Sequence, residues 1–144
     1  MKTCRLIYRL FLPLLLLMSG AAIASTENTP EKISGTTKVT AEMIFELFET
    51  HDDLVIIDSR TAQDRSKGYI EGSLGIPDGD TTPEVLAQNI PTKSTPVVFY
   101  CNGPKCGRSV KTSKMAVASG FTKVFWFRGG WEEWSSKGLP VSKD

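Results

Sequence analysis

The stretch PVVFYCNGPKCGRS, residues 96–109, decides the fold. Its first half is a continuous apolar run, and runs without polar alternation are typical of strands that are covered on both faces of a parallel sheet. A second run of this kind, LVII, occupies residues 54–57, and a third strand is predicted at 124–127. These runs predict an α/β protein with a mainly parallel sheet.

Helices are predicted between these strands, at residues 61–67, 83–89 and 108–119, each near the length of a crossover. Thr40 is predicted to cap an earlier helix. Apolar residues recur in that helix at helical spacing and predict a buried face: Met43, Ile44, Leu47 and Phe48. With helices on both faces of the sheet, the architecture is expected to be a three-layer sandwich.

The N-terminal 24 residues have the pattern of a cleavable signal peptide. Basic residues at 2, 5 and 9 precede an apolar run at 10–18, and Ala22-Ile23-Ala24 supplies a small-residue cleavage site. The run is shorter than the roughly 20 residues that span a bilayer. We therefore expect cleavage after Ala24, a periplasmic or secreted protein, and no membrane attachment after cleavage.

The next segment, residues 25–38, is rich in Ser, Thr, Glu, Lys and Pro and has no hydrophobic period. It is predicted to be a flexible leader, so that the folded domain comprises residues 39–144. Beyond Ala24 the chain has 14 basic and 16 acidic residues, a net charge of −2. This balance argues against a nucleic-acid partner, because no basic patch is available for one.

The chemistry is expected just after Tyr100, because ligands of open α/β sheets bind at the carboxyl ends of the strands. Cys101 leaves the strand there, and a loop rich in glycine leads to a helix that begins near Arg108. The amides of such a loop can form an anion cradle beside a helix N-terminus. Together with Lys105 and Arg108, this field favours the nucleophilic thiolate of Cys101. The alternative is a small apolar core cysteine.

The chain from Val39 to Val141 resembles the rhodanese (sulfurtransferase) homology domain. Four pieces carry the resemblance in the right order: VIIDSR at 55–60, GYIEGSLGIP at 68–77, VVFYC at 97–101, and GGWEEW at 129–134 followed by GLPV at 138–141. Tyr69 stands where the family pattern has His, and Gly75 where it has Asn. The resemblance implies a five-stranded parallel α/β fold with no metal or cofactor. It also implies that Cys101 accepts a sulfane sulfur as a persulfide and passes it to a thiol or cyanide.

The resemblance further implies a role for the residues around Cys101. A small anionic sulfur donor such as thiosulfate would be bound by the loop: Asn102, Gly103, Lys105, Gly107 and Arg108. The loop amides would stabilise the persulfide anion. Asp58 and Arg60 would support the site from behind, although a purely structural ion pair is an equally good interpretation.

The loop departs from the family pattern in length. Arg108 follows Cys101 by seven positions, where family sulfurtransferases usually place Arg five positions after the cysteine. This difference leaves thiosulfate specificity open. Related dual-specificity phosphatases have Cys-x5-Arg, but this loop is Cys-x6-Arg and no acid is evident for a leaving group. A phosphatase is therefore disfavoured.

The extra length of the loop contains Cys106. This residue has three interpretations: a resolving thiol of a dithiol/disulfide switch, a protective disulfide partner of Cys101, or a bystander. Two cysteines with a distant His51 are too few for zinc. The alternative functions are a periplasmic thiol-disulfide redox protein with a redox partner protein, and a non-catalytic binding module with the same fold.

Overall fold

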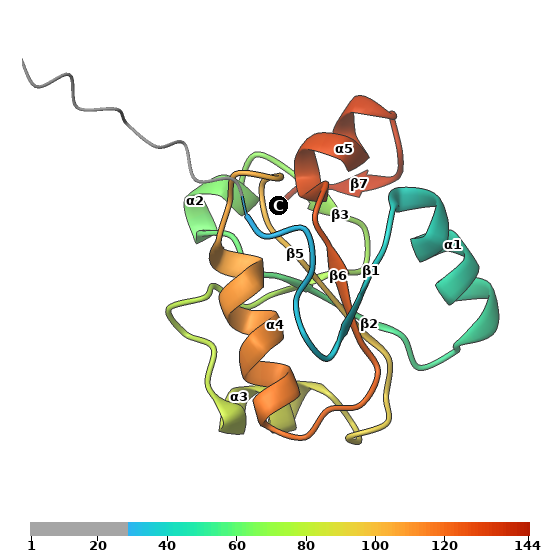
Figure 1. The fold of residues 1–144 in the computed structure, drawn as a ribbon. Coiled ribbons are helices and arrows are strands. Elements are labelled where there is room, and N and C mark those ends of the chain that lie inside the picture. Colours follow the sequence, from blue (N-terminus) through green and yellow to red (C-terminus); the bar gives the residue numbers. More distant parts are fainter. Residues whose placement is uncertain (1–28) are drawn as a thin grey trace, which may run out of the picture.

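The computed structural model describes residues 29–144, and the predicted signal peptide lies outside them. Five strands form one parallel sheet in the order β1-β6-β5-β2-β4 (Figure 1). Their bounds are β1 (Thr36–Lys38), β2 (Val55–Asp58), β4 (Leu74–Gly75), β5 (Val97–Tyr100) and β6 (Val124–Phe127). The predicted fold class is confirmed, and the apolar runs form the three central strands.

Helices cover both faces of this sheet. They are α1 (Ala41–Thr50), α2 (Ala62–Arg65), α3 (Pro83–Asn89), α4 (Arg108–Ala118) and α5 (Gly130–Ser136). Figure 1 shows α3 and α4 on one side of the sheet and α1 on the other. Thr40 caps α1 as predicted, because its hydroxyl accepts a hydrogen bond from the Met43 amide at 3.4 Å. Helix α2 is shorter than the predicted helix at 61–67.

A second, two-stranded sheet was not predicted. β3 (Tyr69–Ile70) pairs antiparallel with β7 (Val141–Ser142) and ties the C-terminus to the middle of the chain. Strands of two residues contain too few side chains to produce a period in the sequence. Within residues 29–144, no helix has the length and apolar character needed to cross a membrane.

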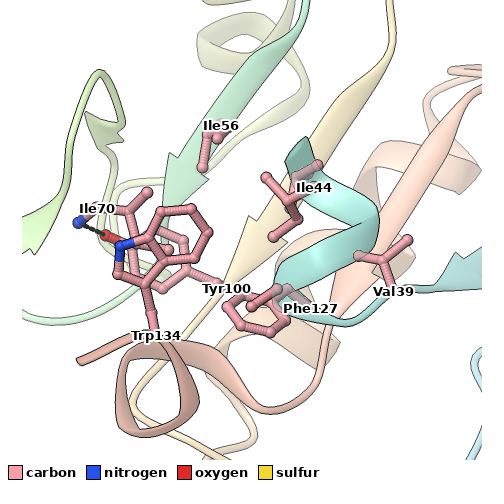
Figure 2. Close-up of a cluster of buried hydrophobic side chains, with 9 residues drawn as sticks. Val39, Ile44, Ile56, Ile70, Tyr100, Phe127 and Trp134 are labelled. Atoms are coloured by element: carbon pink, nitrogen blue, oxygen red, sulfur yellow. Dashed lines mark hydrogen bonds between the residues drawn. The ribbon is translucent and has the colours of Figure 1, made fainter. Parts of the chain in front are cut away.

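Two buried clusters fill the space between the layers. One lies under α1 and α5 and contains Ile44, Ile70, Tyr100, Phe127 and Trp134 (Figure 2). The hydroxyl of Tyr100 accepts a hydrogen bond from the Ile70 amide at 3.2 Å, which is the dashed line in Figure 2. The other cluster lies under α3 and α4 and is built around these residues: Ile57, Leu86, Ile90, Val97, Phe99 and Ala116.

Part of the predicted flexible leader is folded against the domain. Thr36–Lys38 pairs with β6 as the edge strand β1, and Ile33 is buried. Thr29 donates to the Pro104 carbonyl through both its amide, at 3.0 Å, and its hydroxyl, at 2.7 Å. These contacts depend mainly on the backbone, so the polar composition of the segment concealed them.

The buried face of α1 also differs from the prediction. Ala41 and Ile44 are fully buried, whereas Met43 and Phe48 are 37% and 43% exposed. The small side chain of Ala41 allows the first turn of α1 to lie against the core. The buried face therefore lies closer to the start of the helix than predicted. Phe45 stacks instead on Trp134, with 5.4 Å between the ring centroids.

Candidate active site

A cavity of about 950 Å³ opens at the carboxyl ends of the central strands. It is lined by residues in and around α2, after β4, in the loop after β5, at the start of α4 and in α5: Arg60, Asp64, Lys67, Asp78, Asn102, Gly103, Lys105, Cys106, Gly107, Arg108, Trp131, Glu132 and Ser135. Parallel strands bring their carboxyl ends to one edge of the sheet, which explains why residues so distant in sequence meet there.

The loop after β5 is held by the start of α5. The amide of Trp131 donates to the Cys101 carbonyl, and that of Glu132 donates to the Asn102 carbonyl, both at 2.8 Å. The Cys106 amide donates to the Gly103 carbonyl at 3.0 Å and closes a turn within the loop. The loop is therefore fixed through its carbonyl groups at one end and by its own turn at the other.

Gly130 permits the close approach of α5 to this loop. Its φ is 57°, and a Cβ atom there would collide with the Cys101 carbonyl. Gly138 has a similar φ of 64°, but a Cβ atom at Gly138 would meet nothing within 4 Å. The two glycines thus share one backbone conformation and differ in steric surroundings.

We expect Gly130→Ala to destabilise the protein more than Gly138→Ala, as measured by urea unfolding. Alanine at Gly138 should lower the free energy of unfolding by about 1–2 kcal/mol, because its backbone must adopt a left-handed conformation. Alanine at Gly130 must adopt the same conformation and also displaces the loop, so we expect a further loss of at least about 1 kcal/mol. Equal destabilisation of the two variants would show that the loop and α5 do not need this approach.

Cys101 and Cys106 are joined in a disulfide, and their Cα atoms lie 6.1 Å apart. The two sulfurs have different surroundings. Cys101 is 1% exposed and does not line the cavity, whereas Cys106 is partly exposed and does. Nη1 of Arg108 lies 3.7 Å from the Cys106 sulfur. Of the two bonded cysteines, Cys106 is therefore the one that the cavity exposes.

Most charges that line the cavity are paired. Arg108 contacts Asp78 at 3.4 Å, and Lys67 contacts Asp64 at 3.7 Å. Within residues 29–144, Lys105 and Glu132 are the two ionised lining side chains that form no ion pair. The carboxylates of Asp64, Asp78 and Glu132 also line the cavity, although the sequence made none of them evident as an acid for a leaving group.

Asp58 lies behind the cavity and organises the end of β2. Its carboxylate accepts hydrogen bonds from the Arg60 amide, Nε and Nη2 at 3.0, 2.9 and 2.7 Å. It also accepts from Arg65 Nη1 at 3.2 Å and from the Tyr100 hydroxyl at 2.7 Å. Burial, with the neighbouring Asp58 charge, raises the pKa of Tyr100, so this hydroxyl stays protonated and donates.

Arg60 connects this buried network with the cavity wall. Its guanidinium is 1% exposed, donates to the Gly68 carbonyl at 2.9 Å, and lies 4.8 Å from the centre of the Trp131 ring. Both interpretations of the Asp58–Arg60 pair therefore have a structural basis. The pair is a buried ion pair, and through Tyr100 it also fixes the residue that precedes Cys101.

Five loop amides lie free beside the cysteines. Within residues 29–144, the amides of Asn102, Gly103, Lys105, Gly107 and Arg108 donate to no protein acceptor. The Asn102 side chain donates to Asp64 at 3.1 Å, and this hydrogen bond lowers the pKa of Asp64. The residues that carry these free N–H groups therefore line the same cavity as Cys106.

The structure brings most predicted site residues together. Six residues of the loop and the start of α4 line the cavity as a group: Asn102, Gly103, Lys105, Cys106, Gly107 and Arg108. Arg60 joins them, whereas Cys101 and Asp58 lie behind the wall. Sequence reasoning missed Asp64, Asp78 and Glu132, since only the fold brings them to the loop. Glu132 could have been suspected, because it lies in the GGWEEW motif.

Within the described part of the chain, no cluster of three or more His, Cys, Asp or Glu side chains is suited to a metal ion.

Comparison with known proteins identifies relatives of this domain. Residues 40–137 match the family model described as the rhodanese-like domain. A rhodanese domain-containing protein of Drosophila melanogaster is 28% identical over an alignment of 98 residues, and the match covers 60% of this chain and 86% of that protein.

Solved structures share the fold. BH2092 protein from Bacillus halodurans has a TM-score of 0.65 at 20% identity, covering 75% of this chain and 77% of that one. The polysulfide-sulfur transferase of Wolinella succinogenes has a TM-score of 0.63 at 19% identity, covering 76% and 80%. A thiosulfate sulfurtransferase from Pseudomonas aeruginosa has a TM-score of 0.64 at 23% identity, covering 75% of this chain and 20% of that one.

Proposed function

This chain belongs to the rhodanese-like domain family, and from that premise we propose that it is a sulfurtransferase. In the proposed reaction the Cys101 thiolate attacks the outer sulfur of thiosulfate or of a persulfide. The bond between the two donor sulfurs breaks, sulfite or a thiolate leaves with the electron pair, and Cys101 becomes a persulfide. Cyanide or a thiol then attacks the outer sulfur of this persulfide and regenerates the Cys101 thiolate.

The observation that carries the proposal is the set of free loop amides beside Cys101. A persulfide is an anion at neutral pH and needs fixed donors close to its outer sulfur. The unpartnered amides from Asn102 to Arg108 can supply them, because α5 and the internal turn already hold the loop through other groups. Neither a metal nor a cofactor is required for this chemistry.

Lys105 is the best docking group for an anionic donor. The sequence predicted both Lys105 and Arg108 as binding residues, but Arg108 is engaged with Asp78, whereas Lys105 lines the cavity with no acidic partner within residues 29–144. Glu132 faces the same cavity with the opposite charge. The two residues should therefore act on an anionic donor in opposite directions.

We expect Lys105→Met to raise the KM for thiosulfate and Glu132→Gln to lower it, each by about twofold to fivefold, since exposed charges contribute roughly 0.4–1 kcal/mol. Steady-state kinetics of the reduced protein at low and high ionic strength measure this effect. Salt should shrink both changes, because it screens exposed charges. If the KM for thiosulfate moved in the same direction in both variants, the two side chains would not act on the donor through opposite charges.

A second function, thiol-disulfide exchange, is supported by the Cys101–Cys106 disulfide. The two functions leave different marks on the protein. Sulfur transfer adds one sulfur atom to reduced Cys101, whereas thiol oxidation removes two hydrogens from the pair. Intact mass before and after incubation with thiosulfate therefore distinguishes them. Export to the periplasm or outside, proposed from residues 1–24, would place the loop where thiols tend to oxidise.

The experiment that tests the proposed function is a sulfur-transfer assay. Protein is reduced, freed of reductant and given thiosulfate and cyanide, and the thiocyanate formed is measured. Cys101→Ser is compared with the wild-type protein and with Cys106→Ser. Unchanged activity of Cys101→Ser would overturn the proposal.

A further inference from the structure

The two cysteines of the disulfide differ in access from the cavity. Cys106 lines the cavity and is partly exposed, whereas Cys101 is buried behind it. Thiol-disulfide exchange needs the nucleophile to contact the attacked sulfur on the side away from the leaving sulfur, so access decides which sulfur reacts. Cys106 is the cysteine that lines the cavity, so it is the one that a nucleophile in the cavity meets first.

We propose that a small soft nucleophile, in the cell a low-molecular-mass thiol, opens this disulfide at Cys106 and that Cys101 is the leaving group. The inference rests on the proposed function for the later role of Cys101, which the reaction releases as a free thiolate. Cys106 is then the sulfur that carries the incoming group, while Cys101 is left ready to accept sulfane sulfur.

The reaction balances as two exchanges. The first thiolate forms a bond to the Cys106 sulfur, the Cys101–Cys106 bond breaks, and its electron pair leaves on Cys101. A second thiolate attacks the outer sulfur of the mixed disulfide and releases a small-molecule disulfide and the Cys106 thiolate. Two thiols are oxidised and one protein disulfide is reduced. The protons lost by the thiols pass to water or to the protein thiolates.

Charge also directs a nucleophile toward Cys106. Arg108 lies beside its sulfur, and Lys105 is the neighbouring residue on the same wall. Arg108 would also stabilise Cys106 as a leaving thiolate, which favours attack at Cys101. Access outweighs this effect, because attack at Cys101 requires the loop to detach from α5, where two 2.8 Å hydrogen bonds hold it.

Sulfite tests the inference, because it cleaves a disulfide and stays on the attacked sulfur as an S-sulfonate. Oxidised protein is treated with sulfite while iodoacetamide alkylates the sulfur that leaves. Trypsin cleaves after Lys105 and so separates the two cysteines into peptides 94–105 and 106–108. Mass spectrometry of these peptides reads the position of the sulfonate directly.

We expect sulfonate on peptide 106–108 and alkylation on peptide 94–105, with a preference of about tenfold or more, because access selects the attacked sulfur. The same protein unfolded in guanidinium chloride is the control and should show no strong preference. Sulfonate mainly on Cys101, or equal labelling in the folded protein, would overturn the inference. So would a folded protein that resists sulfite while the unfolded protein reacts, or one that forms no disulfide under mild oxidation.

These outcomes are separate from those of the proposed function, because no sulfur donor is present. A protein that takes sulfonate at Cys106 but transfers no sulfur after reduction would contradict the sulfurtransferase proposal alone. A protein that transfers sulfur but takes sulfonate at Cys101 would contradict the inference alone.

Discussion

Replacement of Cys101 by serine is expected to lower the rate of thiocyanate formation by at least about a thousandfold, since a group that carries the reaction covalently has no substitute. Serine fits the site of cysteine closely, so the change should leave the loop and its contacts with α5 in place. Its hydroxyl cannot hold a sulfane sulfur. The assay uses reduced protein with saturating thiosulfate, and the circular dichroism spectrum of the variant should match that of the wild type.

Cys106→Ser is the matched control for this result. It makes the same chemical change five residues away in the same loop and also removes the disulfide. We expect activity within about threefold of the reduced wild type, because an uninvolved thiol can be replaced at little cost. Unlike the wild type, this variant should need no prior reduction. If Cys106→Ser lost activity and Cys101→Ser kept it, Cys106 would be the sulfur carrier.

Asp58→Asn is expected to destabilise the protein by about 3–5 kcal/mol, because removal of one partner leaves a buried charge uncompensated. Asp58 is 0% exposed, and within residues 29–144 the hydrogen bonds to its carboxylate come from Arg60, Arg65 and Tyr100. Asparagine would turn two N–H donors toward groups that are themselves donors. Urea unfolding at neutral pH measures the loss as a lower midpoint with an unchanged slope.

Glu31→Gln is the control for Asp58→Asn, because it removes the same charge from an exposed ion pair. Glu31 pairs with Lys38 at 3.1 Å and with Arg128 at 3.0 Å, but its side chain is 73% exposed. Its loss should move the urea midpoint far less than Asp58→Asn does, because water screens exposed ion pairs. If Asp58→Asn proved equally mild, the buried network would not be what stabilises the end of β2.

The central part of the fold could be predicted because its signals are local. β2 and β5 are runs of apolar residues, and α3 begins and ends where the sequence pattern placed it, at Pro83 and Asn89. Helix caps and buried strands are both encoded within a few neighbouring residues. By contrast, β1 and the β3–β7 pair are formed by backbone hydrogen bonds at sheet edges, which require little of the side chains.

The site was predictable to a similar extent. The loop from Cys101 to Arg108 is contiguous, so one stretch of sequence contains most of its chemistry. The carboxylates that face it come from α2, from the segment after β4 and from α5, and only the sheet order brings them together. The pairing of Arg108 with Asp78 also depends on the sheet order, so the sequence alone could not show that Arg108 is engaged and Lys105 is not.

The contact between Thr29 and Pro104 has a practical consequence for how this domain is produced. A recombinant fragment cut to the family match at 40–137 would begin after β1 and would lack both hydrogen bonds to the loop. β6 would then lose its outer neighbour and offer an unpaired edge to other molecules. Such a fragment should associate in solution through this edge, and its cysteine loop should be less firmly held. Any protein used for assays should therefore begin at or before Thr29.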